Sequence, residues 1–164
     1  MPSDAQRKLI FNRTSYSPSP EQWAVHSDPT RFKLVSGGER AGKSFLSAEE
    51  LLSRLFEGKL FWLVAADYER TRAEFNYTCQ GLAKLGIEFD ASSRVDPGRI
   101  EIVGGFEVLT KSAKDPKVLS SFAPDGIVVC EASQIDYESF LRIRTRAAEK
   151  RARVLLSGTF EGSL

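Results

Sequence analysis

The stretch "VSGGERAGKSF", residues 35–45, decides the fold, because it spells G-x-x-x-x-G-K-S from Gly37 to Ser44. This pattern binds phosphate when it leaves an apolar strand and enters an amphipathic helix. "FKLVSG", which begins at Phe32, supplies the strand. The helix expected after the pattern has an apolar face made of Phe45, Ala48, Leu52, Leu55 and Phe56. The context predicts a phosphate-binding loop, and the alternative is a glycine turn that only precedes a helix.

The rest of the chain alternates between strand-like and helix-like segments. Short apolar runs begin at residues 32, 60, 99, 106, 126 and 153, and the segment "YERTRAEFNYTCQGLAKLG" reads as a second amphipathic helix that stops at Gly86. The runs at 99 and 106 are separated by two glycines, which predicts a hairpin. Strands that alternate with helices predict an α/β fold with a mostly parallel central sheet flanked by helices.

Composition limits the function classes. The chain has 164 residues, of which 41% are hydrophobic and 27% charged, so we expect a single domain over 1–164. The formal net charge of +1 gives no global attraction for nucleic acid, so any such contact must come from a local patch. There is no long apolar run at the N-terminus, which predicts no membrane partner and no secretion. Cys79 and Cys130 form neither a close pair nor a metal-binding pattern, which favours a reducing compartment.

The loop implies specific chemistry for ATP and Mg²⁺. Lys43 is expected to bridge the β- and γ-phosphate oxygens, and the hydroxyl of Ser44 to bind Mg²⁺. The backbone N–H groups of the loop are expected to surround the phosphates. The predicted loop residues are Gly37, Gly38, Glu39, Arg40, Ala41, Gly42, Lys43 and Ser44.

A second candidate site follows the buried strand in "DGIVVCEASQ", residues 125–134. Glu131 lies at the carboxyl end of this strand, where ligands bind in open α/β sheets. A carboxylate there can deprotonate the attacking water and contact Mg²⁺ through another water, which favours a hydrolase over a kinase. The alternative is that Glu131 is an acid at the N-terminus of the next helix.

Several separate stretches resemble the ATPase domain of the large terminase subunit of tailed bacteriophages. They are "YSPSPEQWAVH" (16–26), "VSGGERAGKS" (35–44), "FWLVAADYERTRAEF" (61–75), "LTKSAKDPKVLSSFAPDGIVVCEASQI" (109–135) and "RVLLSGTFEG" (153–162). The resemblance covers nearly the whole chain. It implies a P-loop NTPase of the additional-strand, catalytic-glutamate type. It also implies an ATPase that powers translocation of viral double-stranded DNA into a procapsid.

The resemblance implies partners and further site residues. The partners are double-stranded DNA, other copies of the chain in a ring on a portal, and the small terminase subunit, all in the host cell cytoplasm. Residues 1–30 become an adenine-recognition segment in which Gln22 reads the adenine edge; the alternative is the polar face of a short helix. Thr159 becomes a hydroxyl beside the γ-phosphate; the alternative is an ordinary polar turn. The family continues after this point into a nuclease domain, so we expect no DNA cleavage from these residues.

The chain departs from the family pattern at three places. The loop arginine is Arg40, a candidate catalytic residue that is expected to contact the γ-phosphate or to act on a neighbouring subunit. The family often has this arginine one position earlier, where this chain has Glu39. The family has an Asp before the catalytic Glu, whereas this chain has Cys130. Mg²⁺ is then held by Ser44, the phosphates and water, or else Asp125 or another carboxylate completes the metal shell. The family's Leu-Arg-Gly is replaced by "LSS", residues 119–121.

A basic run supplies candidate replacements for the missing arginine. Its members are Arg142, Arg144, Arg146, Lys150, Arg151 and Arg153. The run can provide an arginine to a neighbouring subunit, contact DNA phosphates, or form a solvated helix face. Among these residues we expect Arg144 to be the catalytic arginine. Two other function classes remain, a nucleotide kinase and a nucleotide-binding assembly module with little or no hydrolysis.

Overall fold

The computed structural model describes residues 1–159, and its centre is one seven-stranded sheet. The strands are β1 (Phe32–Ser36), β2 (Leu60–Ala65), β3 (Phe89–Ala91), β4 (Arg99–Ile102), β5 (Phe106–Ser112), β6 (Gly126–Val129) and β7 (Arg153–Gly158). Their order is β1-β7-β6-β2-β5-β4-β3. The first five strands in this order pair in parallel, and β4 and β3 are antiparallel additions at one edge. The predicted α/β fold with a mostly parallel sheet is confirmed.

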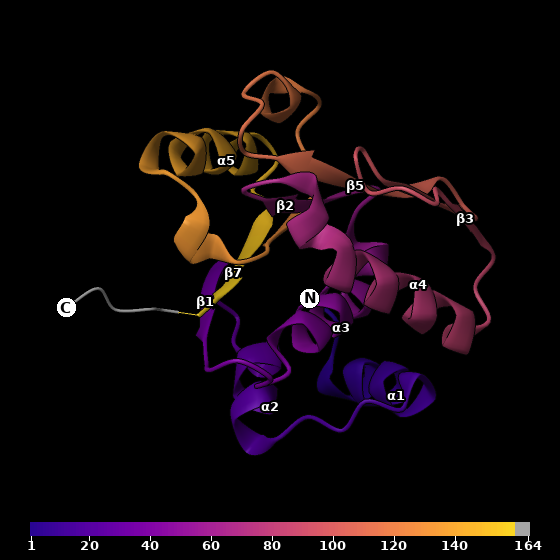
Figure 1. The fold of residues 1–164 in the computed structure, drawn as a ribbon. Coiled ribbons are helices and arrows are strands. Elements are labelled where there is room, and N and C mark those ends of the chain that lie inside the picture. Colours follow the sequence, from indigo (N-terminus) through magenta and orange to yellow (C-terminus); the bar gives the residue numbers. More distant parts are fainter. Residues whose placement is uncertain (160–164) are drawn as a thin grey trace.

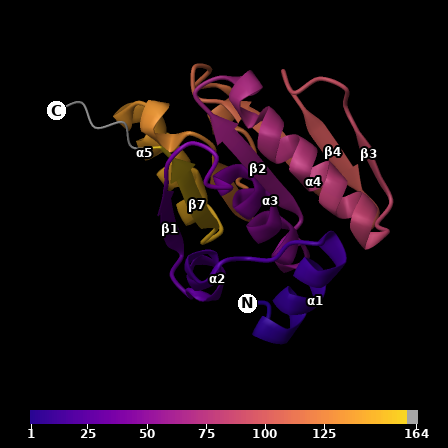
Figure 2. The ribbon, with the colours of Figure 1, turned by 60° about the horizontal axis from the view of Figure 1, so that its bottom comes forward.

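Helices cover both faces of the sheet (Figures 1 and 2). They are α1 (Asp4–Thr14), α2 (Pro20–Ser27), α3 (Lys43–Ser53), α4 (Arg72–Leu85) and α5 (Tyr137–Glu149), with the short 3-10 helices η1 (Leu55–Glu57), η2 (Tyr68–Thr71), η3 (Val118–Ser120) and η4 (Ala132–Gln134). One apolar core joins α3 and α4 to the sheet, and a second core on the other face includes Ile143 and Ala147 of α5. Helix α1 packs on the outer side of α3 and α4. No helix within residues 1–159 has the length and apolar character needed to cross a membrane.

Local sequence patterns account for most of these elements. All six predicted strands are present, and the predicted hairpin joins β4 to β5 through Gly104 and Gly105, whose φ angles of +91° and +80° suit glycine. Helix α4 ends at Gly86 in the left-handed conformation, as predicted. The short strand β3 was not predicted. The placement of Phe56 on the apolar helix face was wrong, because α3 ends at Ser53 and leaves Phe56 68% exposed.

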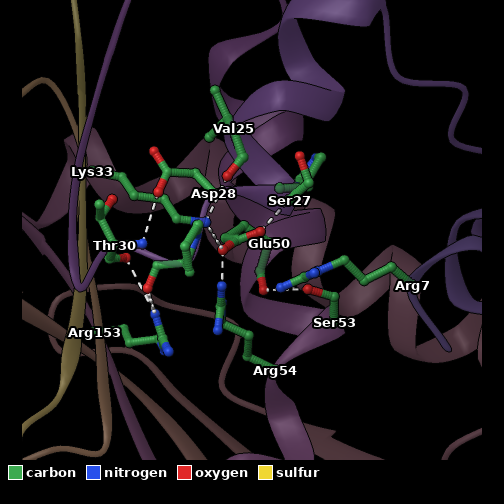
Figure 3. A network of polar contacts seen from close by, with 12 residues as sticks. Arg7, Val25, Ser27, Asp28, Thr30, Lys33, Glu50, Ser53, Arg54 and Arg153 are labelled. Carbon is green, nitrogen blue, oxygen red and sulfur yellow. Dashed lines mark hydrogen bonds and ion pairs between the residues drawn. The ribbon is translucent and has the colours of Figure 1, made fainter. Parts of the chain in front are cut away.

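A buried carboxylate fixes the N-terminal segment to α3 (Figure 3). Glu50 of α3 contacts Nδ1 of His26 at 2.6 Å, Nζ of Lys33 at 3.0 Å and Nε of Arg54 at 2.6 Å. The hydroxyl of Tyr16 in turn lies 3.1 Å from Nε2 of His26. Burial alone would raise the pKa of Glu50, but these hydrogen bonds and positive charges lower it to about 2. The carboxylate therefore stays charged and holds α2 and β1 against the helix that follows the glycine-rich loop.

Candidate nucleotide-binding site

Three segments predicted to act together meet at one edge of the sheet. The glycine-rich loop follows β1, Thr159 follows β7, and Glu131 follows β6, and these three strands are neighbours in the order β1-β7-β6. Because the strands are parallel, their carboxyl ends lie at the same edge. A pocket of about 470 Å³ opens there. It is lined by Glu39, Arg40, Ala41, Gly42, Lys43, Ser44, Phe45, Tyr77, Glu131 and Thr159.

The backbone of the loop explains its glycines. Gly42 has φ +75° and is the N-cap of α3, where its carbonyl accepts the first helical hydrogen bond from the N–H of Leu46 at 2.9 Å. A Cβ on Gly37 would lie 3.2 Å from the Cβ of Ala41, so a side chain there would widen the loop. Gly38 has open space around it and needs no glycine for packing. Arg40 has φ +63°, an uncommon conformation for a residue with a side chain.

Lys43 connects the loop to the end of β7. Its Nζ donates hydrogen bonds to the carbonyl oxygens of Gly37 and Gly38, both at 2.8 Å, and to the Thr159 hydroxyl at 3.0 Å. All three donors of the ammonium group are therefore engaged by the rim of the pocket. The lysine is held at the helix N-terminus, where an anion is also favoured by the helix dipole.

Glu131 turns sharply into the pocket. Its backbone has φ +48° and ψ +53°, and its side chain makes no capping hydrogen bond to η4. Glu131 is also the N-cap residue of η4, so the alternative of an acid at the start of the next helix stays open beside its place in the pocket lining. Gly158 packs against this turn, because a Cβ on Gly158 would lie 3.1 Å from the backbone nitrogen of Ala132. Strained conformations of this kind cost about 1–3 kcal/mol and are concentrated at functional sites.

The residue before Glu131 does not fit a magnesium site. Cys130 is completely buried, and burial raises the pKa of its thiol, so the sulfur stays neutral and soft. The alternative that Asp125 completes the metal shell is wrong. Asp125 lies at the opposite end of β6, where its Oδ2 accepts hydrogen bonds from the backbone nitrogens of Lys59 at 2.8 Å and Leu60 at 2.9 Å.

Comparison with known proteins identifies the fold. No protein-family model and no curated protein matches the sequence. Among solved structures, the large terminase ATPase domain of Thermus phage P74-26 superposes with a TM-score of 0.80 at 21% identity, covering 99% of this chain and 71% of that one. The chain has the fold of a phage large terminase ATPase domain. The fold resemblance inferred from sequence is thereby confirmed.

Two other large terminase structures also match the fold of this chain. The HK97 bacteriophage large terminase matches with a TM-score of 0.67 at 19% identity over 87% of this chain and 33% of that one. A large terminase of a thermophilic bacteriophage, solved in complex with ADP, matches with a TM-score of 0.68 at 14% identity over 85% of this chain and 38% of that one. In the present chain, β7 stands between the loop strand β1 and the Glu131 strand β6. This is the inserted strand of the additional-strand class.

One buried acid beside the pocket was not predicted from sequence. Glu74, in the first turn of α4, is only 3% exposed. Burial raises the pKa of Glu74, hydrogen bonding from the side chains of Ser44 and Cys130 lowers it, and the charge of Glu131 raises it further. The available signal was an acid on the apolar face of the helix, in register with the buried Thr78 and Leu82.

The segment that contains Gln22, predicted to recognise adenine, lies beside the loop. The Nε2 of Gln22 lies 3.3 Å from the position of a Cβ on Gly42. Its Oε1 accepts a hydrogen bond from the Ser19 backbone nitrogen at 2.9 Å, as part of a capping box for α2. Gln22 therefore both caps a helix and presents an amide nitrogen to the loop.

Two aromatic side chains line the pocket, whereas Tyr16 lies in the core. Tyr16 is buried and bonded to His26, so it belongs to the core and cannot stack on a base. Phe45 and Tyr77, which were not predicted to contact a ligand, line the pocket with their ring centroids 5.1 Å apart.

The basic run lies on α5 and after it, away from the pocket lining. Arg144 is exposed and has no hydrogen-bond or ion-pair partner among residues 1–159. Several neighbours are engaged within the domain: Arg142 with Glu138, Arg146 with Glu149 and the carbonyls of Leu119 and Ser120, Lys150 with Asp125, and Arg153 with the carbonyls of Pro29 and Thr30. Arg144 thus differs from most of the run in being free on the surface, and it does not complete the pocket of its own chain.

Proposed function

We propose that the chain hydrolyses ATP and that this hydrolysis powers translocation of viral double-stranded DNA into a procapsid. The observation that carries the proposal is the meeting of Lys43, Thr159 and Glu131 around one pocket, with β7 between the two strands that carry the loop and the acid. The names of structural neighbours support the packaging role, because they include large terminases and the N-terminal domain of the DNA packaging ATPase from bacteriophage phi29, which matches with a TM-score of 0.58 at 14% identity.

The pocket residues have separate roles in this proposal. Lys43 and the loop N–H groups bind the β- and γ-phosphates, and Arg40 contacts the γ-phosphate. The carboxylate of Glu131 accepts a proton from water as the water oxygen bonds to the γ-phosphorus. The bond from that phosphorus to the β–γ bridging oxygen breaks, and ADP and phosphate are released. Thr159, bonded to Lys43 at 3.0 Å, senses whether phosphate is present.

Hard oxygen atoms near the loop fit Mg²⁺. The Ser44 hydroxyl would be the direct ligand, and Glu131 would contact the ion through water. When bound, the ion neutralises charge on the β- and γ-phosphates. The sulfur of Cys130 takes no part, because it is soft and its thiol stays protonated. ADP and ATP-γ-S are bound by structural neighbours of 14% identity, which supports a nucleotide as the ligand of this pocket.

In this proposal, assembly into a ring supplies each pocket with a catalytic arginine from a neighbouring subunit. The chain acts as a ring on a portal in the host cell cytoplasm, with the small terminase subunit as partner and DNA in the pore. Arg144 is exposed and unpaired within residues 1–159, so it is available to reach the pocket of a neighbouring subunit. Gln22 selects adenine through the amide that faces the loop.

ATP turnover and nucleotide binding test the proposal together. Hydrogen bonds to charged groups contribute about 1.5–3 kcal/mol, so Lys43→Ala should weaken nucleotide binding roughly tenfold or more. Glu131→Gln keeps the shape of the side chain, so it should leave binding intact while turnover falls by about 10²–10⁴-fold. Equal ATP binding by wild type and Lys43→Ala would contradict the proposal.

The second candidate is a nucleotide-binding assembly module with little or no hydrolysis. It is favoured by one observation, the buried thiol of Cys130 where the resemblance leads us to expect a metal-shell aspartate. The two candidates differ in turnover by rings assembled on DNA. Nucleotide binding with no turnover by wild-type rings, and no further loss in Glu131→Gln, would favour the module.

A further inference from the structure

Glu74 is a buried acid that the proposed roles leave unexplained. It lies in the first turn of α4, only 3% of its surface is exposed, and its Oε2 has no hydrogen-bond partner within the described residues. Burying one oxygen of an ionisable group without a hydrogen-bond partner costs free energy, so such atoms are rare in folded proteins. A role in ligand binding would account for its presence.

The surroundings of Glu74 point toward the nucleotide pocket. Helices α3 and α4 pack against each other, and both begin at the edge of the sheet where β1 and β2 end. This arrangement brings the Glu74 carboxylate within hydrogen-bonding reach of the side chains of Ser44 and Cys130, and Glu131 is close enough to act on it by charge. Two of these residues, Ser44 and Glu131, line the pocket.

The donor set near Ser44 lacks one feature that Mg²⁺ requires. The ion prefers hard oxygen ligands and keeps several waters, which are usually oriented by carboxylates. Cys130 cannot do this, and Asp125 lies at the far end of β6. Within residues 1–159 no cluster of three His, Cys, Asp or Glu residues could hold a metal ion unaided. Glu74 is the remaining buried carboxylate beside Ser44.

We propose that Glu74 replaces the missing metal-shell aspartate: its carboxylate accepts from the Ser44 hydroxyl and would hold a magnesium-bound water when the nucleotide is bound. The carboxylate reaches the site from helix α4 and not from the strand that carries Glu131. Cys130 then serves as a small neutral neighbour that leaves room for the glutamate. The inference rests on the proposed nucleotide-binding function, and Glu74 acts as a positioning residue.

The test measures Mg²⁺ affinity and not only turnover. ATP-γ-S binding is followed by calorimetry over a series of Mg²⁺ concentrations in wild type and Glu74→Gln. Loss of an outer-shell partner typically costs about 10–100-fold in metal affinity, so the Mg²⁺ dependence should shift by that factor while binding without Mg²⁺ stays unchanged. Glu74→Asp keeps the charge and should give a smaller shift, and it serves as a second variant should Glu74→Gln fold poorly.

A matched control and a rescue separate this role from a structural one. Glu49 is another fully buried carboxylate, on α3 but outside the pocket lining, so Glu49→Gln should leave the Mg²⁺ dependence unchanged. Adding Cys130→Asp to Glu74→Gln restores a carboxylate beside Ser44 and should recover most of the lost affinity. A purely structural role of Glu74 would not be rescued in this way.

The outcomes distinguish failure of the role of Glu74 from failure of the proposed function. Unchanged Mg²⁺ dependence in both Glu74 variants, with nucleotide binding intact, would overturn the role of Glu74 and leave the proposed function standing. A shift that Cys130→Asp fails to rescue would also overturn it. Absence of ATP-γ-S binding by the wild type would overturn the proposed function and the inference that rests on it.

Discussion

Glu49→Gln should stabilise the protein at high pH and not at low pH. Glu49 is fully buried on α3; its Oε2 accepts a hydrogen bond from the Thr14 hydroxyl at 2.8 Å, and its Oε1 has no partner in the part of the chain described. Burial raises the pKa of Glu49 from 4.5 to about 7, although the Thr14 hydrogen bond and the charge of Lys84 lower it. The folded protein therefore holds this proton more tightly than the unfolded chain does.

The sign and the size of the effect follow from proton linkage. Since the folded pKa of Glu49 is the higher one, its contribution to stability is full below about pH 4.5 and is lost as pH rises through about 7. The gap between these values corresponds to roughly 3 kcal/mol in the free energy of unfolding. Glutamine keeps the shape and the acceptor for Thr14 but does not ionise, so the variant avoids this loss.

Urea unfolding of wild type and Glu49→Gln at pH 5 and pH 8.5 measures the effect. Between these two pH values the difference in unfolding free energy should move in favour of the variant by about 2–3 kcal/mol. Any fixed cost of the amide cancels, because the prediction concerns the change with pH. Glu138→Gln, at an exposed position of α5, is the control and should show no such change. A difference between wild type and Glu49→Gln that stays constant with pH would refute the reasoning.

Three further outcomes are expected. Glu50→Gln should destabilise the protein by about 3–5 kcal/mol at neutral pH, because it breaks a buried ionic network. Since the pKa of Glu50 in the folded protein is about 2, the difference in unfolding free energy between wild type and variant, measured in urea, should shrink as pH falls from 4.5 toward 2. Gln22→Ala should reduce the preference for ATP over GTP by about tenfold in calorimetry, and an unchanged ratio would leave Gln22 as a helix cap alone. Mixed rings of Arg144→Ala and Glu131→Gln subunits should regain ATPase activity that rings of either variant by itself lack. Arg142 is paired with Glu138 on the same helix, so rings made only of Arg142→Ala subunits should stay active and serve as the control. No recovery of activity in confirmed mixed rings would exclude Arg144 as the catalytic arginine.

Local signals in the sequence were sufficient for the position of the loop and for six of the seven strands. The glycine pattern, the apolar runs and Gly86 each depend on residues close together in the chain, and the structure forms the elements that they predict. The helix face at Phe56 failed because α3 ends earlier than the apolar periodicity suggests, at Ser53. Periodicity alone does not specify where a helix ends.

Non-local contacts were harder to infer. The role of Glu74 depends on packing between α3 and α4, which places residues 30 positions apart in sequence beside each other. Its signal in the sequence, an acid on an apolar helix face, does not say which pocket the acid faces. Asp125 is close to Glu131 in sequence but far from it in the structure. It precedes β6, whose carboxyl end forms the site, and therefore lies at the opposite end of that strand. The phenol of Tyr16 is likewise turned inward by a buried partner, His26.

The contacts around Lys43 couple the glycine-rich loop to the end of β7. An ammonium group has three donors, and here they are directed to Gly37, Gly38 and the Thr159 hydroxyl, so a phosphate oxygen that binds Nζ must displace one of these acceptors. Thr159 directly follows Gly158, and a Cβ on Gly158 would lie 3.1 Å from the backbone nitrogen of Ala132, in the turn after Glu131. A displacement of the end of β7 should therefore move the turn that carries Glu131 as well as the hydroxyl bonded to Lys43. Because close-packed contacts transmit displacement, a phosphate that binds to or leaves Lys43 in the proposed function should change the constraints on the end of β7 and on Glu131 together.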